Sequence, residues 1–373
     1  MRYLYLLCLL LGSTMLSAQE TITGTIVHDG IERDYRLRVP SASDEAMPLV
    51  FNLHGFGSNA FEQELYAQMN PVADTAGFFV CYPQGVSNAW NVGWAFGSTA
   101  DDVGFISALI DTLSANYNID HNRVYSCGMS NGGFMSYRLA CELSGRVAAV
   151  ASVTGSMAPG TLQQCEPGEA VPVLEIHGTE DDVVAYEGTV NVSLPIPEIL
   201  SFWADNNGCA ETPAEEELPN TSITDASTVT KITYTDCTDA QEVLHYRVNG
   251  GGHTWPGADF AIGVTNQDID ASVEIWHFFN RFTLDDITST AEPVSLSTLE
   301  ATFAPNPVQD MGTLTLNQPY AYYRLLGLSG TVYQEGAHGS GNTIDFSALN
   351  TGIYFLEVLS ADGGRQVLKI AKM

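Results

Sequence analysis

The sequence predicts an α/β protein with a mostly parallel sheet, followed by a small all-β sandwich domain. Two observations lead to this prediction. Short apolar strands alternate with segments of helical periodicity as far as about residue 285, an order typical of a parallel sheet covered by helices on both faces. After residue 298 the helical periodicity disappears, and short strands broken by Gly, Asn and Ser take its place.

The N-terminal 18 residues predict a secretory signal peptide. Arg2 gives a basic start, Leu4–Leu11 an apolar core, and Ser17–Ala18 the small residues that precede a cleavage site. An apolar stretch this short does not span a bilayer, so we expect no membrane span in the mature protein. We expect the protein to be secreted, either extracellular or at the cell surface.

A hairpin is predicted over Ile22–Val39, because Asp29–Gly30 separates two runs in which apolar and polar residues alternate. It would add antiparallel strands at one edge of the sheet. The other elements follow from short apolar runs and from apolar residues at the helical period. The predicted strands are Pro48–Leu53, Phe78–Tyr82, Arg123–Cys127, Val147–Val153 and Val171–His177, and the helices are Asp101–Tyr117, Asn131–Leu143 and Ala271–Phe282.

A change of composition separates the two domains. Residues 286–297 lack periodicity and are rich in Ser and Thr, which is typical of a linker. The predicted organisation is therefore a signal peptide over 1–18, an α/β domain over 19–285, a linker over 286–297 and a β-sandwich over 298–373. The strands expected in the sandwich are Thr313–Leu316, Tyr320–Leu326, Thr343–Phe346, Ile353–Leu359 and Gln366–Ile370.

The net charge argues against some classes of partner. The chain carries 14 Lys and Arg against 44 Asp and Glu, which gives −30 at pH 7. A field this negative repels nucleic acids and anionic membrane surfaces, so we expect no nucleic-acid partner. No Cys/His cluster has the spacing of metal ligands, and we expect neither a metal nor another cofactor.

The pentapeptide Gly128-Met129-Ser130-Asn131-Gly132 has the pattern Gly-x-Ser-x-Gly and falls between a predicted strand and a predicted helix. In that context the serine is a nucleophile on a sharp turn. The two glycines let neighbouring backbone approach, and the helix N-terminus faces a developing oxyanion. Because a Gly-rich turn alone could give this pattern, the interpretation needs further motifs.

A second motif supplies an oxyanion hole. Residues 54–57, His-Gly-Phe-Gly, end a predicted strand. Hydrolases with the Gly-x-Ser-x-Gly turn take one oxyanion N–H from such a loop and another from the residue after the nucleophile. We assign these two donors to the backbone amides of Phe56 and Asn131.

Two more motifs provide an acid and a base. In the His-Gly-Thr-Glu-Asp-Asp segment after a predicted strand, Asp181 is the expected acid and Asp182 the alternative. His253 follows three glycines, whose loop can place an imidazole over the serine. The order Ser130, Asp181, His253 is that of nucleophile, acid and base in α/β-hydrolases. His253 would take the Ser130 proton, and Asp181 would orient the imidazole.

These motifs make the chain resemble the family of secreted poly(3-hydroxybutyrate) depolymerases and feruloyl esterases. The resemblance covers about residues 20–285 and implies an α/β-hydrolase fold with serine carboxylesterase activity. It also implies the same roles for Ser130, Asp181 and His253. One departure is Asp182, where the family often has Pro. The matching segments are LHGFGSNA, ADTAGFFVCYPQG, WNVGW, DDVGFI, GMSNGGFMSYRLAC, HGTEDDVVAY and GGGHTWPG.

The C-terminal segment resembles the sorting domains of type IX secretion. The resemblance lies in Pro305-Asn306-Pro307, in IDFSAL at 344–349, in TGIY at 351–354 and in the two lysines near the end. It implies the type IX secretion machinery as a partner. The alternative is a carbohydrate-binding β-sandwich, for which the tyrosines within Tyr320–Tyr323 would be the exposed aromatic residues.

Esters of extracellular polymers are the expected substrates. Aromatic residues at the predicted strand ends could stack on a phenolic acyl group or on a sugar ring. We therefore rank feruloyl or acetyl esters of plant polysaccharide such as xylan ahead of polyhydroxybutyrate. The rival of another class is a non-catalytic surface binding protein, and a peptidase is a third alternative. The candidate substrate-binding residues are His54, Tyr82, Trp90, Trp94 and Trp255.

Export to an oxidising compartment permits disulfides among the six cysteines that follow the signal peptide. We predict Cys141–Cys165 and Cys209–Cys237, because both pairs lie in irregular or helix-end segments outside the sheet. Cys81 and Cys127 should stay unpaired and buried. In the expected fold their strands flank a third strand, which separates them by about 9–10 Å, too far for a bridge.

Overall fold

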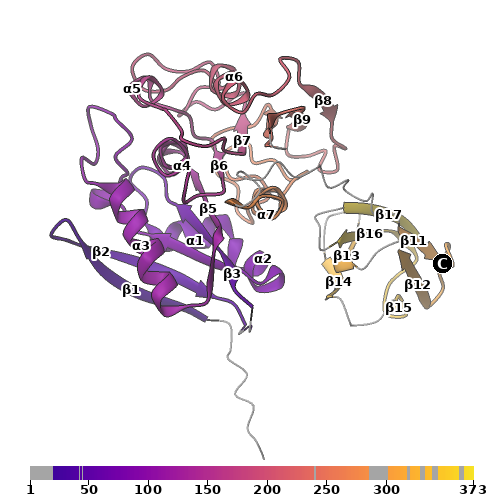
Figure 1. Ribbon diagram of the computed structural model, residues 1–373. Coiled ribbons are helices and arrows are strands. Elements are labelled where there is room, and N and C mark those ends of the chain that lie inside the picture. The colour runs from indigo at the N-terminus through magenta and orange to yellow at the C-terminus, as the bar shows by residue number, and fades with distance from the viewer. Residues whose placement is uncertain are drawn as a thin grey trace, which may run out of the picture.

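The computed structural model describes two parts of the chain (Figure 1). The first is residues 20–284, except 42, 44, 239 and 240, and the second is residues 301–373, except 317–319, 328–331, 338–342 and 361–364. The predicted signal peptide and linker lie outside the described residues, and the predicted domain boundaries remain predictions.

The first part is built on a ten-stranded sheet in the order β1-β2-β4-β3-β5-β6-β7-β10-β9-β8. The six strands from β4 to β10 in this order are parallel, and two antiparallel strands complete each edge. The strands are β1 (Glu20–His28), β2 (Ile31–Val39), β3 (Met47–Leu53), β4 (Phe79–Pro83), β5 (Ile119–Met129), β6 (Ala149–Val153), β7 (Val173–Gly178), β8 (Ala214–Glu217), β9 (Thr228–Tyr234) and β10 (Val243–Asn249).

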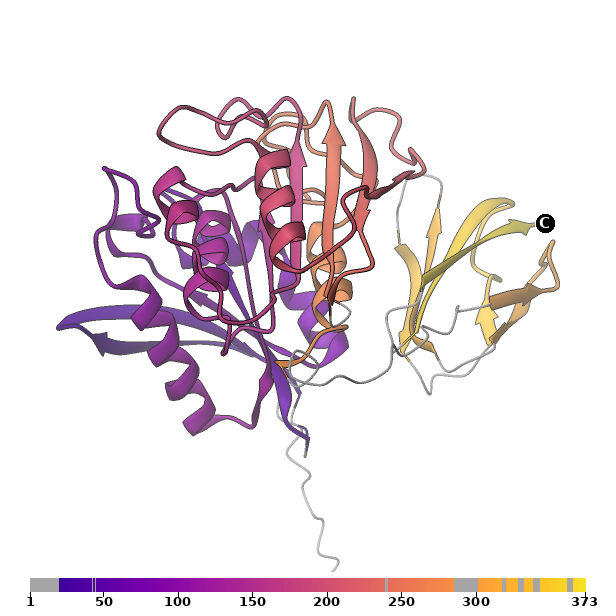
Figure 2. The same cartoon turned by 45° about the horizontal axis from the view of Figure 1, so that its top comes forward.

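Helices cover both faces of this sheet (Figure 2). Helices α1, α2 and α7 pack on one face around a single apolar cluster. Helices α3, α4 and α6 pack on the other face around two clusters. The helices are α1 (Ala60–Ala67), α2 (Met69–Ala76), α3 (Asp102–Asn116), α4 (Asn131–Glu142), α5 (Pro159–Gln163), α6 (Ile196–Asn206) and α7 (Ala271–Phe279), with a short 3₁₀ helix η1 (Val86–Asn88).

This topology confirms the predicted α/β-hydrolase class, including the antiparallel hairpin at one edge. Strands β8, β9 and β10 and helices α5 and α6 were not predicted. The clearest reason is β10, whose sequence VLHYRVN mixes apolar with polar residues although its first four side chains are buried. His245 is buried there because both ring nitrogens have hydrogen-bond partners.

The second part contains only antiparallel strand pairs among its named strands. One sheet has the order β11-β12-β15 and the other β14-β13-β16-β17, with a shared apolar cluster. This is the predicted small all-β module, in which β11 and β14 were not predicted. The strands are β11 (Ala301–Ala304), β12 (Met311–Leu316), β13 (Tyr320–Gly327), β14 (Val332–Ala337), β15 (Thr343–Asp345), β16 (Gly352–Ser360) and β17 (Arg365–Lys372).

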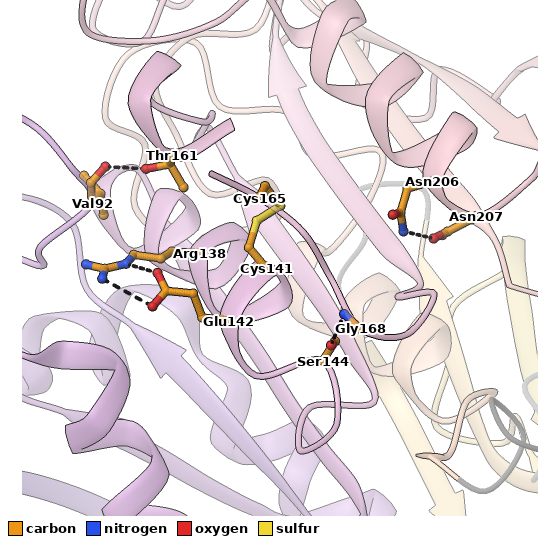
Figure 3. The surroundings of a disulfide bond; sticks show 10 residues. All are labelled: Val92, Arg138, Cys141, Glu142, Ser144, Thr161, Cys165, Gly168, Asn206 and Asn207. Carbon is orange, nitrogen blue, oxygen red and sulfur yellow. Dashed lines mark hydrogen bonds and ion pairs between the residues drawn. A yellow bond between two sulfur atoms is a disulfide. The ribbon is translucent and has the colours of Figure 1, made fainter. Parts of the chain in front are cut away.

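Both predicted disulfides are present, Cys141–Cys165 and Cys209–Cys237. The first ties the end of α4 to the segment after α5 (Figure 3). Cys81 on β4 and Cys127 on β5 are free and buried, and β3 lies between their strands as expected. The Cys141–Cys165 bridge therefore stabilises the helix that begins directly after Ser130.

Removing the Cys141–Cys165 bridge should lower the free energy of unfolding by about 3 kcal/mol, because the unfolded chain then regains the entropy of a loop of this length. The measurement is equilibrium guanidinium unfolding of the Cys141→Ala/Cys165→Ala variant under non-reducing conditions. Replacing the Cys209–Cys237 pair, whose sequence separation is 28 against 24, should cost a similar amount. An unchanged free energy of unfolding in both double variants would contradict the prediction.

Candidate active site

Ser130 occupies the sharp turn between β5 and α4. Its backbone angles are φ 55° and ψ −122°, a conformation that residues other than glycine rarely adopt. A Cβ atom at Gly128 would lie 2.7 Å from the carbonyl oxygen of Leu53, and one at Gly132 only 2.1 Å from the same oxygen. The two glycines are therefore required by the close approach of β3, and the turn presents Ser130 with 9% of its surface exposed.

Two backbone amides lie where an oxyanion hole is expected. Gly55 sits beside the serine, since a Cβ there would be 3.5 Å from the Ser130 Cβ. Phe56 follows in the same loop, and Asn131 is the first residue of α4. In the described part of the chain, neither the Phe56 nor the Asn131 N–H donates to a protein acceptor. Both amides are thus available to an oxyanion.

Trp90 connects the two segments that carry these amides. Its indole Nε1 donates to the carbonyl of His54 (2.9 Å), and its backbone N–H donates to Asn131 Oδ1 (2.7 Å). The His54 ring is buried as well, and its Nε2 accepts from the Gly85 N–H (2.9 Å). Burial lowers the pKa of His54 to about 4, so this ring is neutral and suited to accept that bond.

Asp181 and His253 form a hydrogen-bonded pair, with 2.7 Å between Asp181 Oδ2 and His253 Nδ1. The other oxygen, Oδ1, accepts the backbone N–H groups of Val183 and Val184. Burial raises the pKa of Asp181, but the hydrogen bond and charge of His253 outweigh it, and the pKa lies below its ordinary value. Asp181 is buried and Asp182 is exposed, so the structure brings only Asp181 to the histidine.

The loops after β7 and β10 are held together by their backbones. Glu180 N–H donates to the Gly251 carbonyl (2.9 Å), and Gly250 N–H donates to Thr179 Oγ1 (2.8 Å). A Cβ at Gly178 would lie 2.2 Å from the oxygen of Gly251. The glycines before His253 therefore allow a close approach that places the histidine over the end of β7.

All three proposed catalytic residues follow the carboxyl ends of neighbouring parallel strands. Ser130 follows β5, and its N–H donates to the Val153 carbonyl at the end of β6. Strand β6 pairs with β7, which precedes Asp181, and β7 pairs with β10, which precedes His253. The carboxyl edge of an open α/β sheet is the usual place for a ligand site.

Four of the five predicted substrate-binding side chains lie in the interior instead, and for them the prediction is wrong. Each is at most 1% exposed, which leaves no surface for a substrate. Tyr82, Trp90 and Trp255 lie in the apolar clusters that cover the sheet, where Tyr82 donates to Asn70 Oδ1 and Trp90 to the His54 carbonyl. The four are His54, Tyr82, Trp90 and Trp255.

Three aromatic rings, including that of Phe56, form a partly exposed patch at the segment of the proposed oxyanion hole. Trp94 and Phe96 are stacked with ring centroids 5.0 Å apart, and Phe56 meets Phe96 edge-on at 6.1 Å. Phe56 and Phe96 are 54% and 52% exposed, and Trp94 is half-buried with Nε1 donating to the Val192 carbonyl. We call these three side chains the aromatic patch. Sequence reasoning included Trp94 but missed Phe96, which follows it by two residues in the same loop.

An α/β sheet with a serine on a strand-to-helix turn, followed along the chain by an acid and a histidine at strand ends, is typical of α/β-hydrolases that use a serine nucleophile. A family described as Esterase PHB depolymerase matches residues 34–194, and one described as Secretion system C-terminal sorting domain matches residues 302–372. The chain belongs to this esterase family and is an extracellular or cell-surface esterase. Within the described residues, no helix is both long and apolar enough to cross a bilayer.

Three curated relatives show the extent of the similarity. The putative esterase NocK of Nocardia uniformis is 30% identical over 68% of this chain and 80% of that protein. Feruloyl esterase D of Neurospora crassa is 29% identical over 73% of this chain and 88% of that protein. A bifunctional acetylxylan esterase/xylanase of Neocallimastix patriciarum is 27% identical over 73% of this chain, but only 36% of that protein is covered.

The Asp181→Asn variant should lose at least about a hundredfold in kcat, whereas Asp182→Asn should stay within about twofold of the wild type. The asparagine oxygen can keep the bonds to Val183 and Val184, and its NH₂ group then faces His253 Nδ1 and forces the wrong tautomer. Initial rates on p-nitrophenyl acetate give the comparison. Equal losses in the two variants would overturn the choice of acid.

Proposed function

We propose that this protein is a secreted serine carboxylesterase with Ser130 as nucleophile, His253 as general base and Asp181 as the acid that orients it. The observation that carries the proposal is the turn at Ser130, held in a strained conformation beside two amides without protein acceptors. Such strain persists at functional sites where the surrounding structure enforces it. The 2.7 Å pair of Asp181 and His253 supplies the relay.

The proposed reaction uses these residues in turn. His253 takes the proton of Ser130 while Ser130 Oγ bonds to the ester carbonyl carbon, and the carbonyl oxygen gains the negative charge. The amides of Phe56 and Asn131 stabilise that oxygen, each worth about 3–4 kcal/mol. His253 then passes the proton to the leaving alcohol. Water hydrolyses the acyl-enzyme by the same steps, which returns the proton to Ser130.

We propose feruloyl or acetyl esters of plant polysaccharide as the substrates. The aromatic patch favours a phenolic acyl group, because Phe56 carries both an exposed ring and an amide of the proposed oxyanion hole. A flat ring joined to the reacting carbonyl would therefore lie against the patch. The names of two relatives, a feruloyl esterase and an acetylxylan esterase/xylanase, agree with this class of substrate.

Polyhydroxybutyrate is the second candidate, and the description of the matching family favours it. A chain of small hydroxy acids gains apolar contact from the aromatic patch but little from ring stacking. We propose further that residues 302–372 are read by the type IX secretion machinery and take no part in the chemistry, since every proposed catalytic residue lies before residue 284.

The Ser130→Ala variant should lose at least about a thousandfold in kcat on p-nitrophenyl acetate with an unchanged circular dichroism spectrum and melting temperature, because only one oxygen is removed. Turnover near the wild-type rate in a folded variant would refute the nucleophile and, with it, the proposed function. No hydrolysis of p-nitrophenyl acetate by the wild type would instead favour the alternative of a binding protein that performs no chemistry.

The Phe96→Ala variant should lower kcat/KM for methyl ferulate by about three- to tenfold, the value of one lost aromatic contact. Hydrolysis of ethyl butyrate should change little. The matched control is Phe260→Ala, which removes an exposed ring that contacts Tyr66 and lies outside the aromatic patch. If a short 3-hydroxybutyrate oligomer is the better substrate of the wild type, or if both variants behave alike, the phenolic assignment is wrong.

A further inference from the structure

A buried pair of ionisable side chains lies behind the proposed catalytic acid. Glu175 and His177, both on β7, have no exposed side-chain surface, and 2.9 Å separates His177 Nδ1 from Glu175 Oε1. The other ring nitrogen, Nε2, lies 2.8 Å from the Val184 carbonyl and 3.5 Å from Asp181 Oδ2. His253 bonds to that same Asp181 oxygen, which thus faces two imidazoles.

The hydrogen bonds restrict where the protons can be. The Val184 carbonyl only accepts, so His177 Nε2 carries a proton. Tyr137 OH donates to Glu175 Oε2 (2.7 Å), which favours an ionised carboxylate. The contact of Glu175 Oε1 with His177 Nδ1 then needs one proton. If that proton is on Nδ1 the pair is a carboxylate and an imidazolium, and if it is on Glu175 both partners are neutral.

The charges around His177 favour the imidazolium. Burial alone would lower the pKa of His177, but the hydrogen bond and charge of Glu175, with the charge of Asp181 and the Val184 carbonyl, raise it above the ordinary value. Burial also raises the pKa of Glu175, against the hydrogen bonds from His177 and Tyr137. Asp181 lies on the far side of the ring from Glu175, so the cation has an acidic neighbour on each side.

The neighbouring histidine on β10 provides the contrast. His245 Nδ1 donates to the backbone carbonyl of Glu175 (3.0 Å), and its Nε2 accepts from Tyr186 OH (3.0 Å). Burial lowers the pKa of His245 to about 3, and no hydrogen bond to a carboxylate opposes this effect. His245 is therefore neutral. The titratable and charged groups that face His177 from the surrounding elements are Glu175, Asp181, His253, Tyr137, Tyr186, His245 and Arg247.

We propose that His177 is an imidazolium, held by Glu175, that shares Asp181 Oδ2 with His253 and thereby sets the pH range in which His253 acts as a base. His177 is a positioning residue, since it acts on the reaction only through Asp181. A fixed cation beside Asp181 offsets part of the negative charge that this carboxylate presents to His253, which favours the neutral imidazole that the reaction needs. This inference rests on the proposed roles of Asp181 and His253.

The protonation state can be observed without any activity measurement. In the ¹⁵N-labelled full-length mature protein at pH 7, both ring nitrogens of His177 should show the chemical shifts of protonated nitrogens, while His245 should show one protonated and one unprotonated nitrogen. The His177→Gln variant identifies the signals. One unprotonated nitrogen in His177 would overturn the proposal, because the pair would then be neutral.

The kinetic test is the Glu175→Gln variant. Glutamine can still accept from Tyr137 and can donate to His177 Nδ1, so every hydrogen bond is kept while His177 becomes neutral. The midpoint of the acid limb of kcat/KM should move upward by about 0.5–1 pH unit, since the cation beside Asp181 is lost. The Tyr137→Phe variant, which removes one donor to Glu175, should shift the limb in the same direction by less.

The matched control is Tyr186→Phe, which removes the donor to His245 and leaves the Glu175–His177 pair intact. It should lower stability without moving the acid limb. A Glu175→Gln profile that coincides with the wild type, or an equal shift in Tyr186→Phe, would contradict the proposal. Loss of the proposed function itself would be recognised differently, by full activity of Ser130→Ala with the His177 nitrogen signals unchanged.

Discussion

The turn at Ser130 depends on a contact between backbones that no side chain separates. The carbonyl of Leu53, at the end of β3, occupies the space that a Cβ at Gly128 or Gly132 would need. On the other side, the Ser130 N–H donates to Val153 at the end of β6. A residue at φ 55° costs about 1–3 kcal/mol, and it persists here because β3 and β6 fix the turn from both sides. The position of the proposed nucleophile is thus a consequence of the strand order β3-β5-β6.

The other half of the site depends on polar groups inside the sheet. Strands β7 and β10 are interior strands of the ten-stranded sheet, yet they bury Glu175, His177 and His245. Burying such groups is costly unless each has partners, and here Tyr137, Tyr186 and backbone carbonyls provide them. The result is a rigid support beneath Asp181, in which hydrogen bonds rather than apolar packing determine orientation.

The sequence predicted the turn at Ser130 better than it predicted the buried polar groups of β7 and β10. The glycine motifs could be interpreted from the sequence because they report a backbone requirement that only glycine meets, as Gly132 shows. The strands and helices with clear apolar periodicity followed too. Strand β10 was missed because the network around His245 replaces the apolar pattern that identifies a buried strand. Whether an aromatic residue such as Trp255 lies inside or outside is decided by tertiary packing of the loops, which local sequence does not encode.

Trp90 is buried and has no surface for a substrate, but its hydrogen bonds still connect it to the proposed site. Its indole and backbone hold the carbonyl of His54 and the side chain of Asn131, one from each segment of the proposed oxyanion hole. A buried ion pair supports the same loop, since Asp102 bonds to Arg33 and accepts the N–H of Asn91 beside Trp90. Oxyanion donors stabilise charge effectively only if they are oriented in advance, because reorienting them during the reaction would cost much of the free energy that they contribute. An aromatic residue without exposed surface would therefore still serve catalysis, by fixing the amides of the proposed oxyanion hole.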